Sequence, residues 1–76
     1  MWQEIDSKLS KTFNFPNFLE ALVFVNKVGA VAELLGHHPE IFFTWGKVVI
    51  TTTTHDEGNK ITEKDRQLTA EIDKLA

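Results

Sequence analysis

The amino-acid sequence predicts an α+β fold in which two helices pack on one face of a four-stranded antiparallel sheet. The expected order is strand, strand, helix, strand, strand, helix. Residues 8–15 alternate between apolar and polar side chains, residues 18–35 are apolar at helical spacing, and residues 48–54 are all β-branched. Alternation with period two is typical of half-buried strands, and apolar spacings of three and four residues are typical of helices. Two helices with one main apolar stripe each are expected to share a sheet face.

The first two strands are expected to form a hairpin at the start of the chain. The segment KLSKTFNF, residues 8–15, is the longer strand. Its alternation predicts one face that carries Leu9, Lys11, Phe13 and Phe15. Trp2–Ile5 is the candidate partner strand, with Asp6 and Ser7 in the turn.

A long helix is expected to follow. Asn17 is a good N-cap, and Glu20 three residues later completes a capping-box pattern. Gly36 is a natural C-terminal stop. One helical face is predicted to carry Ala21, Val25, Val28, Ala32 and Leu35. Apolar side chains also occupy the other faces, so a second subunit is expected to cover part of this helix.

The second half of the chain repeats the strand–strand–helix pattern. Ile41–Trp45 is a short aromatic strand, Gly46–Lys47 a tight connection, and Val48–Thr54 a strand suited to a pleated sheet. In that strand, one face is predicted to carry Val48, Ile50, Thr52 and Thr54. Residues 55–59 form a turn, and Thr62 caps the final helix. The apolar stripe of this helix is Leu68, Ile72 and Leu75.

Length and composition limit the classes of function. Seventy-six residues form one domain, and a chain of this size buries only about 60% of its unfolded surface, so oligomerisation is expected to supplement the core. There is no cysteine, the net charge is −3, and the basic residues are scattered, which argues against direct nucleic-acid binding. No apolar segment approaches the roughly 20 residues of a membrane span, and no signal peptide begins the chain. A cytoplasmic protein is expected.

The residues suited to chemistry are the three histidines. His37 and His38 follow the long helix, and His55 closes the threonine-rich strand. Histidine both gives and takes protons near neutral pH, and Glu33, one helical turn before His37, is placed to orient an imidazole. Two alternatives stay open at this stage. The histidines are solvated loop residues, or they form a three-histidine zinc site, although no H-x-H or H-x-x-x-H spacing is present.

Other motif classes are absent. The sequence contains no P-loop, no G-x-G-x-x-G and no G-x-S-x-G, so nucleotide binding and serine hydrolysis have no support. Trp2 and Trp45 are either core or interface residues, or they stack on a flat ligand.

The joint spacing of these residues resembles a known family. The segment ELLGHHP, followed by Trp45, His55 and Asp65, is similar to the signature of the pterin-4a-carbinolamine dehydratases. The acid-x-x-x-His-His-Pro start of that signature corresponds to Glu33, His37, His38 and Pro39. The resemblance covers the chain from Trp2 and implies a single dehydratase-like domain, residues 1–76, that lacks the family's usual extra N-terminal helix.

The resemblance also implies a reaction. The family dehydrates 4a-hydroxytetrahydropterin to quinonoid dihydropterin, a hydro-lyase step that recycles the tetrahydrobiopterin cofactor of aromatic amino-acid hydroxylases. No metal and no cofactor are needed. On this interpretation His37 and His55 are the acid/base pair and His38 mainly holds the pterin. The expected substrate-binding residues are Glu33, Pro39, Trp45, Thr53, Asp65 and Trp2.

The same resemblance implies partners. A homodimer or homotetramer is expected, and an aromatic amino-acid hydroxylase is a candidate partner. The competing class of function is a non-catalytic binding module, because some members of the family are dimerisation cofactors of a homeodomain transcription factor.

Overall fold

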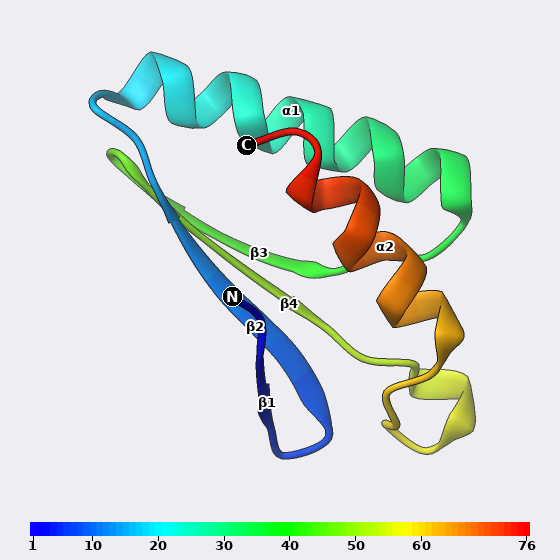
Figure 1. Ribbon diagram of the computed structural model, residues 1–76. Helices are drawn as coiled ribbons and strands as arrows, with labels where there is room; N and C mark the ends of the chain where they lie inside the picture. The colour runs from blue at the N-terminus through cyan, green and yellow to red at the C-terminus, as the bar shows by residue number, and fades with distance from the viewer.

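Both helices cover the same face of a four-stranded antiparallel sheet in the computed structural model, which describes all 76 residues (Figure 1). The strand order across the sheet is β1-β2-β4-β3. The elements in chain order are β1 (Gln3–Ile5), β2 (Lys8–Asn14), α1 (Phe18–Leu35), β3 (Glu40–Thr44), β4 (Lys47–Thr52), the short 3₁₀ helix η1 (His55–Glu57) and α2 (Glu63–Asp73). The predicted fold class and element order are confirmed.

Each hairpin turns through two residues. Asp6 and Ser7 connect β1 to β2 as predicted, with φ of 51° and 63°, the left-handed backbone that a tight hairpin turn needs. The second turn is Trp45–Gly46, and the predicted Gly46–Lys47 connection is wrong. A Cβ on Gly46 would lie 2.4 Å from the carbonyl oxygen of Phe15, so this close approach of the two backbones requires glycine in the turn.

The core lies between the sheet and the two helices. Its eight buried apolar residues are Phe13, Ala21, Phe24, Val28, Val48, Ile50, Leu68 and Ile72. The predicted stripe of α2 is confirmed at Leu68 and Ile72, which are both fully buried. On α1 the centre of the buried face is Phe24, whereas the predicted Val25 is only half-buried. Phe24 turns inward because it packs against the ring of Phe13, with ring centroids 4.7 Å apart.

Strand β4 ends two residues earlier than predicted. Thr53 and Thr54 leave the ladder, and Thr54 instead pairs with Lys60 across the loop that contains η1. The side chains of Thr52 and Thr54 still point to the same side, as the alternation predicted, because both donate to one carboxylate. The sheet therefore delivers a row of hydroxyl groups to the point where α2 begins.

The outward face of α1 keeps apolar side chains in contact with solvent. Leu19 and Leu34 are 67% and 85% exposed, and Val23 is also exposed. Neither helix has the length and hydrophobicity that crossing a membrane would require. The expectation that a second subunit covers α1 stays a prediction.

Candidate active site

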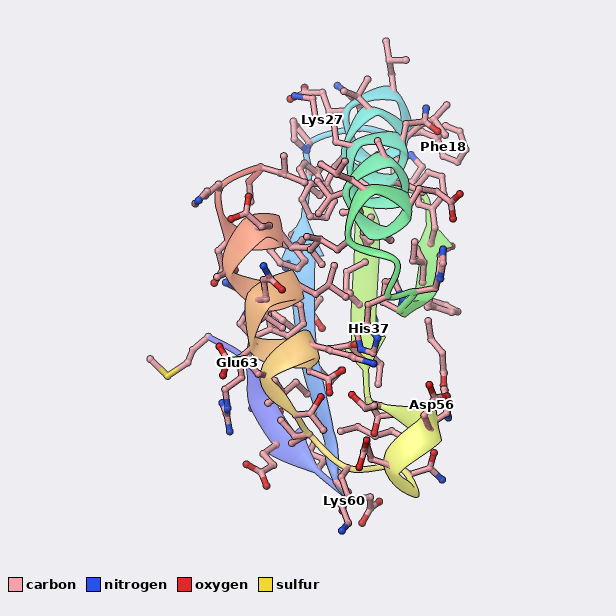
Figure 2. The ribbon with its side chains drawn as sticks, turned by 90° about the vertical axis from the view of Figure 1, so that its right-hand side faces the viewer. Phe18, Lys27, His37, Asp56, Lys60 and Glu63 are labelled. Carbon is pink, nitrogen blue, oxygen red and sulfur yellow. The ribbon has the colours of Figure 1, made fainter.

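The three histidines line one pocket of about 220 Å³. It lies where α1 and β4 end and α2 begins. Figure 2 shows His37 between the end of α1 and the loop that carries Asp56. No hydrophobic side chain lines this pocket. Its lining residues are Gly36, His37, His38, Thr53, Thr54, His55, Asp56 and Lys64.

The end of α1 sends the two adjacent histidines in different directions. Gly36 has a left-handed φ of 66°, its N–H donates to the carbonyl of Glu33, and the N–H of His37 donates to the carbonyl of Ala32. These two bonds form a Schellman motif, so the predicted stop at Gly36 is confirmed. The side chain of His37 points inward and is 13% exposed, whereas that of His38 is 61% exposed.

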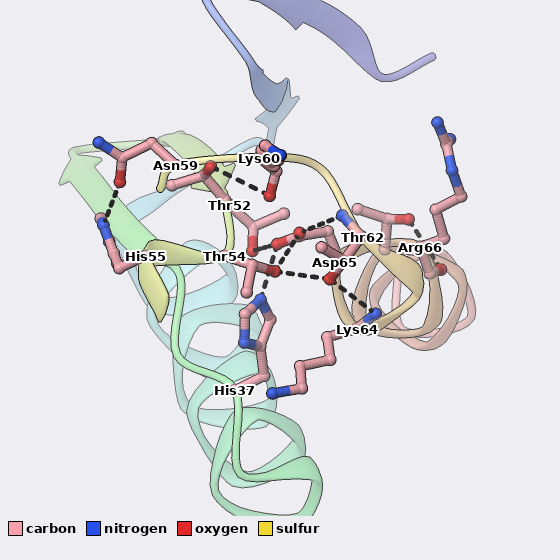
Figure 3. Close-up of polar contacts among 12 residues, drawn as sticks. His37, Thr52, Thr54, His55, Asn59, Lys60, Thr62, Lys64, Asp65 and Arg66 are labelled. Carbon is pink, nitrogen blue, oxygen red and sulfur yellow. Dashed lines mark hydrogen bonds and ion pairs between the residues drawn. The ribbon is translucent and has the colours of Figure 1, made fainter. Parts of the chain in front are cut away.

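A buried carboxylate lies behind His37. Asp65 is fully buried in the first turn of α2, and its Oδ1 lies 2.7 Å from Nε2 of His37 (Figure 3). The same oxygen accepts the hydroxyl of Thr52 at 2.7 Å, and Oδ2 accepts the hydroxyl of Thr54 at 2.7 Å and the backbone N–H of Thr62 at 2.9 Å. Asp65 is therefore both half of the capping box of α2 and the partner of a pocket histidine.

These donors keep Asp65 ionised. Burial alone would raise the pKa of its carboxyl group, but the hydrogen bonds from His37, Thr54, Thr62 and Thr52 outweigh burial and lower the pKa from 3.8 to about 2. An ionised carboxylate only accepts hydrogen bonds, so Nε2 of His37 must carry the proton between them. Nδ1 is then the ring nitrogen of His37 left for a ligand. The carboxylate also balances the charge of the imidazolium that forms when His37 binds a second proton.

The other two histidines have partners of their own. Nε2 of His38 pairs with the Oε2 atom of Glu33, and both side chains are exposed to solvent. Nδ1 of His55 lies 2.8 Å from the amide oxygen of Asn59. Each pocket histidine thus has one ring nitrogen held by a different kind of acceptor: a buried carboxylate, an exposed carboxylate or a neutral amide.

The structure brings most of the predicted site residues together. Thr53 lines the pocket and donates its hydroxyl to the carbonyl of Ser7. Glu33 reaches the pocket only through His38, and Asp65 only through His37 and the threonines. Pro39 directly follows His38 and lies outside the pocket lining.

The two tryptophans lie elsewhere. Trp45 is in the turn at the start of β4, and this six-residue strand spans about 20 Å to the pocket end. The indole N–H of Trp2 donates to Asp73 at the far end of α2, an 11-residue helix about 16 Å long. Neither residue lines the pocket within this chain.

Sequence reasoning did not select five residues that belong to the site. Gly36, Thr54, Asp56 and Lys64 line the pocket, and Asn59 contacts His55. Lys64 directly precedes Asp65, an expected site residue, so the sequence did contain a signal that Lys64 lies near the site. No signal marked Asn59, because its contact depends on the path of the loop. No three His, Cys, Asp or Glu side chains are grouped so that they could hold a metal ion.

Comparison with known proteins places the chain in a family. The family model described as pterin 4 alpha carbinolamine dehydratase matches residues 1–75. A protein of Picosynechococcus sp., provisionally named a pterin-4-alpha-carbinolamine dehydratase, is 43% identical over 74 residues, which is 97% of this chain and 79% of the relative. A protein of Sulfolobus acidocaldarius with the same provisional name is 40% identical over 74 residues, 97% of this chain and 80% of the relative.

Comparison with solved structures points to the same family. A transcriptional coactivator/pterin dehydratase from Brucella melitensis is similar with a TM-score of 0.92 and 34% identity, over 99% of this chain and 81% of that one. A pterin dehydratase-like protein identified as a RuBisCO assembly factor in the α-carboxysome is similar with a TM-score of 0.81 and 28% identity, over 100% and 87%. The chain belongs to the pterin-4a-carbinolamine dehydratase family.

Proposed function

We propose that the protein dehydrates 4a-hydroxytetrahydropterin to quinonoid dihydropterin, in the recycling of tetrahydrobiopterin. The observation that carries this proposal is that His37 and His55 line the same small pocket while the two side chains behind them differ in charge. A pocket of about 220 Å³ is smaller than the roughly 300–1,000 Å³ typical of drug-sized ligands, and it suits a bicyclic ring whose substituent extends into solvent.

The reaction needs one acid and one base. The carbon–oxygen bond at ring position 4a breaks, and the hydroxyl group leaves as water after it receives a proton. The adjacent ring nitrogen loses its proton, and that electron pair forms the new carbon–nitrogen double bond. No electrons are exchanged with another molecule. Hydroxide is a poor leaving group, so a positioned acid is expected to accelerate the step by roughly 10²–10⁴-fold.

His37 is the acid in this mechanism. Its Nε2 proton is held by the ionised Asp65, so the second proton of its imidazolium form is on Nδ1, and Nδ1 is the atom that protonates the departing hydroxyl. His55 is the base. Its partner, the amide of Asn59, is neutral and so does not favour the charged imidazolium form of the ring before the substrate arrives. His55 is exposed, so the proton that it removes returns to solvent.

The remaining lining residues hold the ring. His38, oriented by Glu33, is the main hydrogen-bonding partner of the pterin. Thr53 and Lys64 line the same space. Pro39 limits the freedom of the loop that follows the two histidines.

The exposed apolar face of α1 supports a second role, as a surface for a partner protein. Leu19, Val23 and Leu34 lie open to solvent on this short chain. A second copy is the expected occupant, in a dimer or tetramer, and an aromatic amino-acid hydroxylase or a transcription factor is the alternative. The names of the two similar structures, a transcriptional coactivator and a RuBisCO assembly factor, are consistent with partner binding in this family.

One experiment separates the two classes of function. If the proposal is correct, the purified protein removes a 4a-hydroxytetrahydropterin faster than its spontaneous dehydration. A protein that only binds partners leaves the spontaneous rate unchanged.

A further inference from the structure

The loop between β4 and α2 is closed at its base and holds its tip in one conformation. The N–H of Thr54 donates to the carbonyl of Lys60 at 2.9 Å, and the N–H of Lys60 donates back at 3.2 Å. Inside this loop, the N–H of Gly58 donates to the carbonyl of His55 at 3.0 Å. Gly58 and Asn59 both have left-handed backbones, with φ of 74° and 61°. The loop therefore fixes where Asn59 lies relative to His55.

Asparagine suits this position for two reasons. It is one of the few residues other than glycine that adopts the left-handed region at low cost. It also carries an amide oxygen, which lies 2.8 Å from Nδ1 of His55 (Figure 3). An amide oxygen only accepts hydrogen bonds, so Nδ1 of His55 carries the hydrogen, and in the neutral ring the lone pair is on Nε2.

We infer that Asn59 is a positioning residue for the reaction: its side-chain amide holds His55 in the Nδ1–H tautomer and leaves Nε2 as the base. Only the role of Nε2 as a base rests on the proposed function; the tautomer of His55 does not depend on it. The arrangement at His37 is the opposite, since there Nε2 bears the hydrogen and faces Asp65. His55 and His37 thus have different tautomers and partners of different charge, because Asn59 of the loop holds His55 and Asp65 of α2 holds His37.

Several titratable side chains lie near His55. His37, His38, Asp56 and Lys64 line the pocket with His55, and the adjacent Glu57 lies on the same loop. None of these groups makes a hydrogen bond or ion pair to the His55 ring, whose partner is Asn59. A change at Asn59 therefore acts directly on this ring.

The test is long-range ¹H–¹⁵N NMR of the histidine rings in the labelled full chain, at a pH where His55 is neutral. The wild-type spectrum is expected to show the Nδ1–H tautomer at His55. Asn59→Gly keeps the left-handed backbone and removes the acceptor, so His55 is expected to lose this preference and become a mixture of tautomers. The kcat of Asn59→Gly is expected to fall at least about threefold with little change in KM, since only the base is affected.

Asn59→Asp is the conservative variant. Its carboxylate accepts the same hydrogen bond, so the Nδ1–H tautomer is retained. The added negative charge favours the imidazolium form of His55. Because the base acts only when it is unprotonated, the rise of kcat/KM on the acid side is expected to move to higher pH by at least about 0.5 unit. Glu57→Gln, in the same loop, is the matched control and is expected to keep the wild-type tautomer.

An Nε2–H tautomer at His55 in the wild-type protein would overturn the inference, as would an Nδ1–H tautomer that persists in Asn59→Gly. The amide spectrum verifies that each variant is folded. The ring spectrum is independent of turnover, so an inactive wild-type protein refutes the proposed function and leaves the tautomer result standing. An active protein with the wrong tautomer refutes only the role of Asn59.

Discussion

Asp65 and His37 are 28 positions apart in the chain, yet Oδ1 of the carboxylate lies 2.7 Å from Nε2 of the ring and the carboxylate is fully buried. The contact joins the end of α1 to the start of α2. It links stability to chemistry, because Asp65 also caps α2 and receives the hydroxyls of Thr52, at the end of β4, and Thr54, just beyond it. A change at this carboxylate is expected to alter both.

Asp65→Asn is expected to lower kcat for pterin dehydration by at least about tenfold. The amide carries no charge to balance the imidazolium of His37, and its NH₂ group competes with the Nε2–H donor. Steady-state kinetics at neutral pH provide the measurement. Asp73→Asn, at the other end of α2, is the control and is expected to retain wild-type kcat. Equal losses in the two variants would show that Asp65 acts only through the stability of the helix.

The lowered pKa of Asp65 predicts how stability depends on pH. The ionised carboxylate is favoured in the folded state, so its contribution to the free energy of unfolding is present above pH 3.8 and is lost as pH falls towards about 2. The shift corresponds to about 2 kcal/mol, at 1.36 kcal/mol per pKa unit. Urea unfolding between pH 5 and pH 2 is expected to show a loss smaller by about this amount in Asp65→Asn. Identical pH profiles would contradict the assignment.

Thr54→Val is expected to lower the free energy of unfolding by about 1–3 kcal/mol. The variant keeps the shape of the side chain but removes a donor to the buried Oδ2 of Asp65. Urea unfolding at neutral pH measures this cost. Thr12→Val, at an exposed position on β2 with no side-chain hydrogen bond, is the matched control and is expected to change stability by less than about 0.5 kcal/mol. If the two variants cost the same, the carboxylate cluster is not a source of stability.

Glu33→Gln is expected to raise KM for the pterin several-fold and to leave kcat within about twofold. The carboxylate of Glu33 hydrogen-bonds to His38, and His38 holds the substrate in the proposed mechanism. Because Glu33 is exposed, stability is expected to be unchanged. A fall in kcat with an unchanged KM would instead place His38 among the proton-transferring groups.

Local patterns predicted the fold well. The caps at Asn17 and Thr62 and the stop at Gly36 are confirmed because each depends on side-chain or backbone chemistry within a few residues. The β3–β4 turn was misplaced by one residue, because its position depends on a contact between Gly46 and the distant Phe15. Phe24 is buried in place of the predicted Val25 because α1 packs against Phe13 of the sheet, which is also a contact between residues distant in the sequence.

The site was less predictable than the fold. The three histidines were selected from residue chemistry and spacing, and the pocket contains all three. The role of Asp65 as the buried partner of His37 could not be deduced from spacing, since it requires the packing of α2 against the end of β4. The contact between His55 and Asn59 depends on two left-handed backbones in one loop. The tryptophans were expected at the site from the resemblance to the family, and their residue chemistry alone left a place in the core or an interface equally open.

The most direct measurement is the rate at which the purified chain removes a 4a-hydroxytetrahydropterin generated in the assay, with and without a chelator. We expect the wild-type protein to exceed the spontaneous rate, with no effect of the chelator. We expect His37→Ala and His55→Ala to lower kcat at least about tenfold while remaining folded. Lys27→Ala, on α1 and away from the pocket, is expected to match the wild type. A wild-type rate equal to the spontaneous rate, or full activity in both histidine variants, would contradict the account.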